Sequence, residues 1–374
     1  MRSFASHIST GLRLRGHTVL EMSPPVVLGN LVKNQASMAK WLGYIDQFII
    51  FPFILACQLQ KLPPATLIVF CDQALGAWIP LIRDRPHVVH CHDFLAVDAS
   101  LGLIPEWKTP LLGRIFQILI RTGFRRARFF ISVSNSTRTA LHRHLLKAPT
   151  YSHILYNPLP SRFQAREIKE VDLASQFPGL KSGQFLFHLG KDWYKNRLGV
   201  LSIWEQLRKS GSSLDLVLVG ELEPELQVWI CSRPHLSPYI YIFSYLSDDQ
   251  LLCLYRLASA LLFPSFYEGF GWPILEALAC SCTVFTTDRA PMNEVGGRFA
   301  IYLPAPPLPT DPEAWLHWSS QSASIISSQL LRSSCHHTQC NIGLKDWLSS
   351  FSLDEWLDSL ERHYLSVLRL QGHD

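Results

Sequence analysis

Short apolar runs of six or seven residues recur along the chain, and longer stretches with helical spacing separate them. Predominantly apolar runs of this length predict strands buried on both faces, because a strand with one solvated face alternates apolar and polar positions. Strands that alternate with helices predict parallel sheets covered by helices, which is an α/β fold. The runs occupy residues 65–70, 87–92, 128–134, 185–190, 214–220, 260–265 and 282–287.

A proline-containing segment, 155–163, divides the runs into two series. The chain has 374 residues, which is more than one hydrophobic core usually organises, and 48% of them are hydrophobic. We therefore expect an N-terminal domain over 1–160 and a C-terminal domain over 161–350. A final helix is expected over 351–370, with Ser352 as its N-cap, and it could pack back on the N-terminal domain.

The net charge of +4 hides an uneven distribution. Residues 1–160 contain 17 Lys and Arg against 7 Asp and Glu, whereas residues 161–374 contain 17 against 23. A basic N-terminal half indicates an anionic partner, such as a phospholipid surface or a lipid pyrophosphate. No nucleic-acid-binding module accompanies it, so we expect no nucleic acid partner.

The stretch 109–130 interleaves five arginines with an apolar face. This pattern is compatible with a helix on an anionic membrane surface and with an ordinary helix on the domain surface. The longest apolar run, 48–57, has ten residues and contains a proline, so it is too short to cross a bilayer. Nine scattered cysteines without a secretory leader favour a cytoplasmic protein, or one associated with the cytoplasmic face of a membrane.

Two cysteine spacings loosely resemble metal sites, at Cys280 with Cys282 and in the segment 335–340. We expect ordinary thiols at both and no metal ion. The acidic pair at 248–249 lies between the two ends of a capping box, Ser247 and Gln250, so we expect these two aspartates in the first turn of a helix rather than at a metal.

Two glutamates eight positions apart, Glu268 and Glu276, flank a glycine-rich turn within the segment 264–282. Gly269 and Gly271 allow the backbone to approach a ligand, and the N–H groups at the start of the following helix favour polar oxygens. One carboxylate on the loop and another in the first helical turn can accept hydrogen bonds from hydroxyls of one ligand. This arrangement predicts a sugar nucleotide.

A second loop follows the apolar run 185–190. Gly190 ends the run, Lys191 and Lys195 lie in the loop, and a helix is expected to begin near Asn196. Lysine is a good point-charge partner for phosphate, so this loop is compatible with a phosphate-binding site. A solvated basic loop is the alternative.

Together the two segments resemble the donor site of retaining GT-B glycosyltransferases of family 4, also called glycosyl transferases group 1. The resemblance covers most of the chain from about residue 11 and is strongest over 184–303. It implies two Rossmann-like domains that face each other across a cleft, with the acceptor on the N-terminal side and the donor in the C-terminal domain. It also implies metal-independent, retaining transfer of a hexose from a nucleotide diphosphate sugar to a hydroxyl, without a cofactor.

The resemblance also implies roles for single residues of the donor site. Glu268 would contact the donor sugar and Glu276 the ribose hydroxyls. Lys195 stands at the family's lysine position for the diphosphate, with Lys191 or Arg197 as the second charge. The further donor-binding candidates are Gly190, Gly269, Phe270, Gly271 and Glu294.

His92 is the last residue of the run 87–92 and is expected just past the end of its strand. It resembles the family's histidine that faces the donor sugar, so His92 and Glu268 are the catalytic candidates. His90 is expected to pack in the sheet. Ser134 is a weaker candidate, because a role as a helix N-cap would explain it equally well. The loop at Glu221 is likewise weaker, because this side chain can simply be solvated.

The chain also departs from the family pattern. The stretch 4–22 resembles the first helix of family members, which typically follows a strand and a glycine-rich loop, so we expect that either the start is an internal methionine or the first strand is lost. Ser281 and Thr283 replace a common glycine and proline, and Arg298 with Phe299 replaces small or acidic residues. If Ser281 adopts a positive φ, the strain costs about 1 kcal/mol.

Other function classes stay open at this point. A GT-B epimerase would interconvert nucleotide sugars without an acceptor, and a catalytically degraded sugar-nucleotide-binding protein would bind a donor without turnover. A glycosidase would use two carboxylates but would not need the loop after Gly190. The acceptor is open among a glycan, a lipid-linked sugar and a small molecule.

Overall fold

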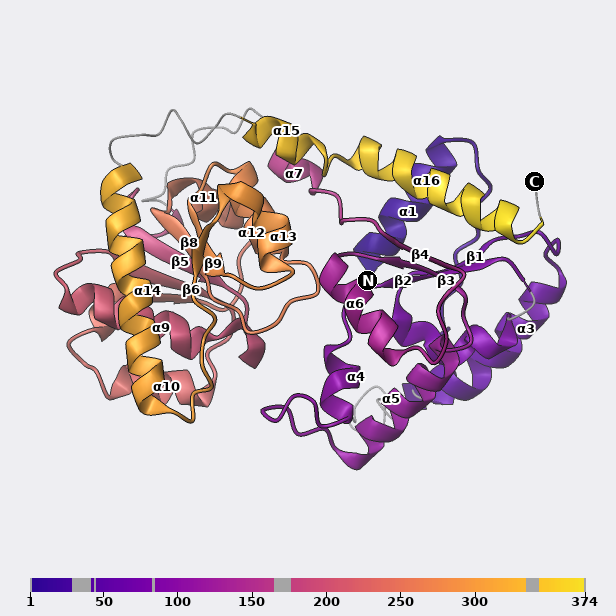
Figure 1. Ribbon diagram of the computed structural model, residues 1–374, viewed down its shortest axis with the longest axis horizontal. Helices are drawn as coiled ribbons and strands as arrows, with labels where there is room; N and C mark the ends of the chain where they lie inside the picture. The colour runs from indigo at the N-terminus through magenta and orange to yellow at the C-terminus, as the bar shows by residue number, and fades with distance from the viewer. Residues whose placement is uncertain are drawn as a thin grey trace. The chain divides into compact units, whose positions relative to one another are not determined.

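The computed structural model divides the chain into two compact units, each described here by itself (Figure 1). The N-terminal unit comprises Met1–Tyr156 and Trp356–Asp374, and the C-terminal unit comprises Asn157–Glu355. Each unit contains one parallel sheet with helices packed on it. The structure describes residues 2–28, 42–43, 45–82, 85–164, 176–333 and 343–372.

The N-terminal unit is built on a four-stranded sheet with parallel pairing and the order β1-β2-β3-β4. The two central strands are buried throughout, which explains their apolar composition. The strands are β1 (Ile68–Phe70), β2 (His87–Cys91), β3 (Phe129–Ser132) and β4 (Tyr151–Ile154). The helices are α1 (Arg2–Leu14), η2 (Asp46–Ile50), α3 (Phe51–Gln60), η3 (Gln73–Leu81), α4 (Leu95–Ser100), α5 (Leu111–Phe124) and α6 (Asn135–His144).

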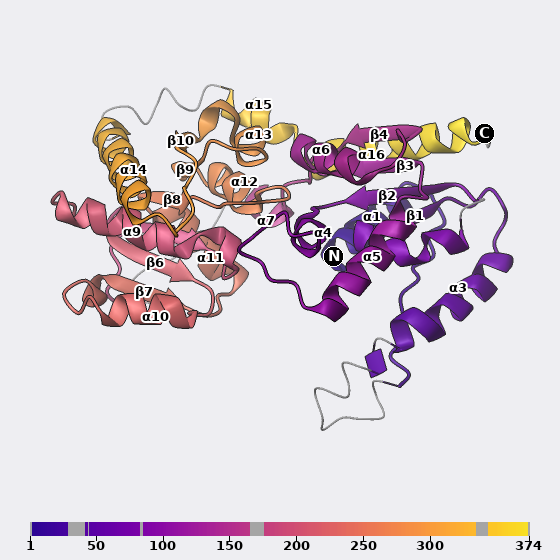
Figure 2. The ribbon, with the colours of Figure 1, turned by 60° about the horizontal axis from the view of Figure 1, so that its bottom comes forward.

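The last helix, α16 (Leu353–Leu370), lies along α1 and β4 over most of its length (Figure 2). The Tyr364 hydroxyl lies 2.8 Å from Nε2 of His90, so the final helix is tied to the centre of the N-terminal sheet. His90 is buried there, as predicted. Ser352 Oγ accepts a hydrogen bond from the Glu355 N–H at 3.3 Å, which confirms the predicted N-cap.

The C-terminal unit is built on a six-stranded parallel sheet with the order β10-β9-β8-β5-β6-β7. Its strands are β5 (Phe185–Leu189), β6 (Asp215–Val219), β7 (Ile240–Phe243), β8 (Ala260–Phe263), β9 (Val284–Thr287) and β10 (Ile301–Leu303). Its helices are α7 (Ser161–Gln164), η4 (Trp193–Lys195), α9 (Arg197–Lys209), α10 (Pro224–Cys231), η5 (Ser237–Tyr239), α11 (Asp248–Leu257), α12 (Trp272–Ala279), α13 (Met292–Gly296), η6 (Gly297–Phe299), α14 (Pro312–Ser333) and α15 (Leu344–Ser349).

The order of this sheet reverses direction between β5 and β8. From β5 the chain builds β6 and β7 toward one edge, and then β8, β9 and β10 toward the other. In open parallel sheets, ligands bind beyond the carboxyl ends of the strands at such a switch point. The loop that contains Lys195 follows β5, and the loop that contains Glu268 follows β8. Both loops therefore begin at this switch point.

Three strands were not predicted from the sequence: β4, β7 and β10. All three lie at sheet edges and are only partly buried. β4 (YSHI) carries polar side chains, as an edge strand can because its exposed side faces water, whereas β7 (IYIF) and β10 (IYL) are apolar but only four and three residues long. The apolar runs therefore identified the interior of the sheets better than their edges.

Ser281 adopts φ of 59°, as expected if it replaces a family glycine. Because a side chain in the left-handed region is strained, Ser281→Gly should raise the free energy of unfolding by about 0.5 kcal/mol, after the greater freedom of glycine in the unfolded chain is subtracted. Chemical denaturation measures this change. Ser281→Ala is the control, because alanine keeps the strain. A glycine variant that is less stable than the alanine variant would show that the site is unstrained, because only the greater freedom of glycine in the unfolded chain would then separate the two.

Candidate functional site

The loop after β5 folds back over its own first residue. Gly190 has φ of +122°, and a Cβ at this position would lie 2.9 Å from Cγ of Lys195. Only glycine combines this backbone conformation with room for a neighbouring side chain. Gly190 therefore allows the Lys195 side chain to lie against the end of the strand.

Asn196 joins this loop to the loop after β8. It has φ of 58°, and its Oδ1 accepts a hydrogen bond from the Gly199 N–H at 3.1 Å, which caps α9. Its Nδ2 donates to the carbonyl oxygen of Pro264 at 2.9 Å. Both bonds are buried, so the backbone on either side of Asn196 is fixed in position. Lys195 is the residue immediately before this anchor.

Lys195 and Glu268, predicted from two separate loops, are in direct contact. The Lys195 Nζ lies 2.7 Å from Oε1 and 2.9 Å from Oε2 of Glu268. The two side chains are only 14% and 7% exposed. A buried ion pair is held by its geometry, because removing either partner leaves the other charge uncompensated. The switch point thus presents an ammonium group and a carboxylate side by side.

The glycine-rich turn leads into α12. Gly271 has φ of +102° and occupies the N-cap position, so the helix begins at Trp272. Gly269 precedes Phe270, whose ring is buried against Trp272 at a centroid distance of 5.4 Å. The placement of Glu276 in the first helical turn was wrong, because a helix that begins at Trp272 puts Glu276 in its second turn.

Glu276, a residue of α12, has a buried side chain. Its Oε2 accepts a hydrogen bond from the Tyr255 hydroxyl at 2.8 Å, and its Oε1 lies 3.9 Å from a guanidinium nitrogen of Arg162. Burial raises the pKa of Glu276 to about 7, against the lowering effect of Tyr255 and Arg162. The carboxyl group is therefore close to half protonated at neutral pH and can act as donor or acceptor.

The sequence did not decide whether Lys191 or Arg197 supplies the second positive charge for the diphosphate. Arg197 is buried, and its guanidinium donates to Glu223 Oε2 at 2.6 Å and to the carbonyl oxygen of Glu221. It therefore holds the loop after β6. Lys191 is exposed, and its Nζ lies 3.0 Å from Oε2 of Glu221. Of the two candidates, Lys191 is the one that a diphosphate could approach.

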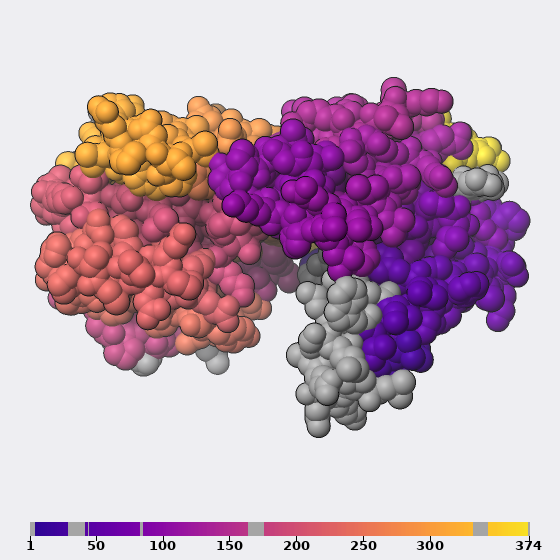
Figure 3. Space-filling view, turned by 90° about the horizontal axis from the view of Figure 1, so that it is seen from below, coloured from indigo at the N-terminus to yellow at the C-terminus, as the bar shows by residue number. Residues whose placement is uncertain are grey.

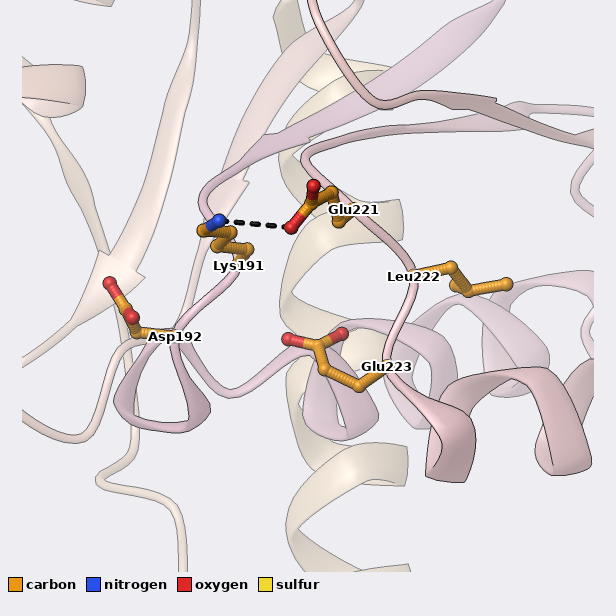
Figure 4. A pocket seen from close by; sticks show the side chains of 5 residues that line it. All are labelled: Lys191, Asp192, Glu221, Leu222 and Glu223. Atoms are coloured by element: carbon orange, nitrogen blue, oxygen red, sulfur yellow. Dashed lines mark hydrogen bonds and ion pairs between the residues drawn. The ribbon is translucent and has the colours of Figure 1, made fainter. Parts of the chain in front are cut away.

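Lys191 also lines a hollow of about 320 Å³ at the carboxyl ends of β5 and β6 (Figure 4). Asp192, Glu221, Leu222 and Glu223 form the rest of its lining. Figure 4 shows the Lys191 and Glu221 side chains pointing toward each other across it. The predicted loop at Glu221 is thus in contact with the predicted phosphate loop.

Glu294 lies in α13, which follows β9, and is half-buried. Arg289, between β9 and α13, donates to the carbonyl oxygen of Phe266 in the glycine-rich loop at 3.1 Å. This bond connects the loop that precedes α12 to the segment that leads into α13. The role of Glu294 toward a donor stays a prediction.

His92 lies in the N-terminal unit, just after β2. Its Nε2 donates to the Cys71 carbonyl oxygen at 2.9 Å, and its ring meets Phe4 edge-on at 4.6 Å. Burial lowers the pKa of His92 to about 4, so the ring is neutral at neutral pH. Since the carbonyl can only accept, Nε2 carries the proton. Its predicted role toward the donor sugar stays a prediction.

Two further capping predictions are confirmed. Ser134 Oγ accepts from the Thr137 N–H at 3.0 Å at the start of α6. Ser247 and Gln250 form the capping box of α11, so the acidic pair 248–249 lies in its first turn.

No group of three or more metal-ligating side chains is present among the described residues. The cysteine spacing at 335–340 lies outside them.

Sequence reasoning missed Tyr255 and Arg162, the two partners of Glu276. Tyr255 lies in the apolar stretch of α11 and is fully buried, so its sequence context is that of a core residue. Arg162 lies within the proline-containing segment 155–163 and also pairs with Asp248 at 2.7 Å. No local pattern marks either residue, because both reach Glu276 from distant parts of the chain.

Comparison with known proteins agrees with this geometry. Residues 181–298, which include both loops, match the family described as Glycosyl transferases group 1. The chain is 33% identical over 206 residues to O-antigen chain mannosyltransferase B of Escherichia coli, with 54% of each chain covered. It is 23% identical over 243 residues to O-antigen chain mannosyltransferase RfbU of Salmonella typhimurium, with 63% of this chain and 60% of the relative covered. The matches span just over half the length of these relatives.

The fold has a close counterpart among solved structures. Sucrose-phosphate synthase from Thermosynechococcus elongatus superposes with a TM-score of 0.71 at 15% identity, over 98% of this chain and 93% of that chain. At this identity the likeness concerns the fold alone. The α/β architecture with two parallel sheets is that of the GT-B proteins.

Proposed function

We propose that this chain, whose residues 181–298 form a Glycosyl transferases group 1 domain, is a glycosyltransferase that uses a nucleotide diphosphate sugar. In this proposal it transfers a hexose to a hydroxyl acceptor, with retention of configuration and without a metal ion. The acceptor is a glycan, a lipid-linked sugar or a small molecule.

The contact between Lys195 and Glu268 carries the proposal. It lies at the switch point, where the loops after β5 and β8 meet and where a parallel sheet binds its ligand. An ammonium group beside a carboxylate suits a ligand that has a phosphate next to a polyol. Lys195 would bind the diphosphate and Glu268 would accept hydrogen bonds from the sugar.

The proposed role of the protein in the reaction is electrostatic. As the bond from sugar to phosphate breaks, negative charge grows on the leaving diphosphate, and a fixed ammonium group nearby stabilises it. Lys195 and Lys191 would supply the positive charge that a divalent cation supplies in other transferases. A phosphate oxygen of the donor would take the proton of the acceptor hydroxyl on the face that is attacked. Glu276 would bind the ribose hydroxyls.

A mannosyl donor is the first to test, because both relatives described above are O-antigen chain mannosyltransferases. A panel of nucleotide sugars should include one that raises the free energy of unfolding by about 2.7 kcal/mol at 100 times its dissociation constant. With a hydroxyl acceptor, that donor should yield a product whose anomeric proton, in NMR spectra, shows the donor's configuration. Transfer should continue in the presence of EDTA.

Each alternative has its own outcome in this experiment. A new sugar nucleotide formed without acceptor would indicate an epimerase. Binding of a donor without transfer to any acceptor class would indicate a degraded sugar-nucleotide-binding protein. If no nucleotide sugar stabilises the chain, the proposed function is wrong.

A further inference from the structure

One face of α5 in the N-terminal unit is apolar and exposed to solvent. Leu111 is 76% exposed, Ile115 53% and Ile118 58%, and Leu119 and Leu112 are exposed as well. Because successive residues of a helix turn by about 100°, these positions lie on one side of it. Single exposed apolar side chains are common, whereas a contiguous stripe marks an interaction surface. We call these five residues the α5 stripe.

The opposite face of α5 holds the helix firmly on the unit. Gly123 and Gly76 bring the backbones of α5 and η3 so close that a Cβ on either glycine would overlap the other segment. Phe124 is fully buried in the core beside Ile120. The α5 stripe therefore cannot turn inward without breaking this packing.

The charges on α5 are of one sign. Its sequence, LLGRIFQILIRTGF, contains Arg114 and Arg121 and no acidic residue. Arg125 and Arg126 follow directly after the helix. At 100° per residue, Arg114 and Arg121 lie together along one border of the α5 stripe. The helix thus combines an apolar surface with a basic border.

A neighbouring segment adds to this surface. The ring of Phe48 in η2 lies 5.0 Å from the ring of Phe116 in α5, so the two helical segments are adjacent. Ile49 and Phe53, from η2 and α3, are also exposed. Figure 3 views the molecule from the side of the N-terminal unit on which α3 and α5 lie.

We propose that the α5 stripe and its basic border bind the surface of an anionic phospholipid bilayer. An apolar stripe bordered by arginines suits the boundary between acyl chains and negatively charged head groups. There the apolar side chains can contact acyl chains while the arginines pair with the head groups. A protein partner would need an acidic rim around an apolar groove. An anionic bilayer presents negative head groups and apolar acyl chains over its whole surface. In the part of the chain that the structure describes, no helix could span a bilayer, so this contact lies on the surface.

This proposal stands independently of the transferase activity. If both hold, the chain would work beside its membrane, and a lipid-linked acceptor becomes the acceptor class of choice. The vesicle experiment below needs neither donor nor acceptor, so its failure would leave the proposed activity untouched.

Sedimentation with lipid vesicles tests the proposal on the full chain. Wild type should bind phosphatidylglycerol-containing vesicles at low salt and should bind pure phosphatidylcholine vesicles at least about tenfold more weakly. Ile118→Glu with Leu119→Glu should lower binding to the anionic vesicles at least about tenfold, because two apolar contacts are replaced by two negative charges. Leu331→Glu is the matched control, since this leucine is 75% exposed in α14 of the other unit, and it should bind like wild type.

A second variant tests the charge contribution without touching the stripe. Arg114→Gln with Arg121→Gln should lower binding to anionic vesicles about 25-fold, or about fivefold for each arginine. Equal binding by wild type and both double variants would overturn the proposal, as would no binding of wild type to anionic vesicles. A dimer in gel filtration that only Ile118→Glu with Leu119→Glu disrupts would also overturn it, because the stripe would then join two copies of the chain.

Discussion

Lys195→Met should weaken the binding of a nucleoside diphosphate about 100-fold, which corresponds to about 3 kcal/mol. The substitution removes a charge-assisted hydrogen bond to phosphate, and it also removes the ammonium group beside the Glu268 carboxylate, which is 7% exposed and then lies next to the ligand's own negative charge. Both effects oppose binding. Isothermal titration calorimetry with nucleoside diphosphates and their sugars measures the change, and Lys209→Met, an exposed lysine of α9, is the matched control.

Loss of the lysine should also destabilise the fold, since breaking a buried ion pair costs about 3–5 kcal/mol. Weak binding of Lys195→Met could then result from unfolding. The double variant Lys195→Met with Glu268→Gln separates the two effects, because it leaves no buried charge unpaired and should recover most of the stability. It should still bind the nucleoside diphosphate weakly.

The single variant Glu268→Gln completes this set. It removes a negative charge next to the diphosphate, so nucleoside diphosphate binding should stay equal or become tighter. The additional affinity contributed by the sugar should fall about tenfold, because a charged acceptor of sugar hydroxyl bonds becomes a neutral amide. Unchanged sugar affinity in this variant would contradict the assignment of Glu268 to the sugar.

Glu276→Gln should change how the stability of the chain depends on pH. Burial raises the pKa of Glu276 from 4.5 to about 7, so between these values the native state keeps a proton that the unfolded state releases. The wild type therefore loses stability as pH rises through this window. The loss is complete about one pH unit above the native pKa and amounts to about 3 kcal/mol, at 1.36 kcal/mol per pKa unit.

Glutamine is neutral at every pH and can still accept the hydrogen bond from the Tyr255 hydroxyl. The difference in unfolding free energy between Glu276→Gln and wild type should therefore grow by about 3 kcal/mol from pH 4.5 to pH 8. Glu225→Gln, at an exposed position of α10, is the control for the loss of one acidic group. A difference that is the same at both pH values would show that the pKa of Glu276 is the same in the native and unfolded states.

Much of the fold could be predicted because its central strands are buried on both faces. Runs such as Phe185–Leu189 and Ala260–Phe263 are apolar at every position or nearly so, and this pattern alone predicts a buried strand at these residues. Edge strands such as Tyr151–Ile154 carry polar side chains that face water, and no local pattern separates them from loops. What identifies an edge strand is its partner, and the partner lies far away in the sequence.

The candidate site shows the same division. Glycines, prolines and charged residues at fixed spacing identified the loops of Lys195 and Glu268, because such loops need particular backbone conformations. The contact between these two residues, and the burial of Glu276 against Tyr255, could not be predicted. They depend on the order of strands in the sheet, which places β8 next to β5 although some 70 residues separate the two along the chain.

A crystal structure of the chain with a bound nucleotide diphosphate sugar tests the central claim most directly. We expect the Lys195 Nζ within about 3 Å of a phosphate oxygen and the Glu268 carboxylate within hydrogen-bond distance of a sugar hydroxyl. A ligand whose diphosphate lies away from Lys195, with the pair to Glu268 unchanged, would contradict it.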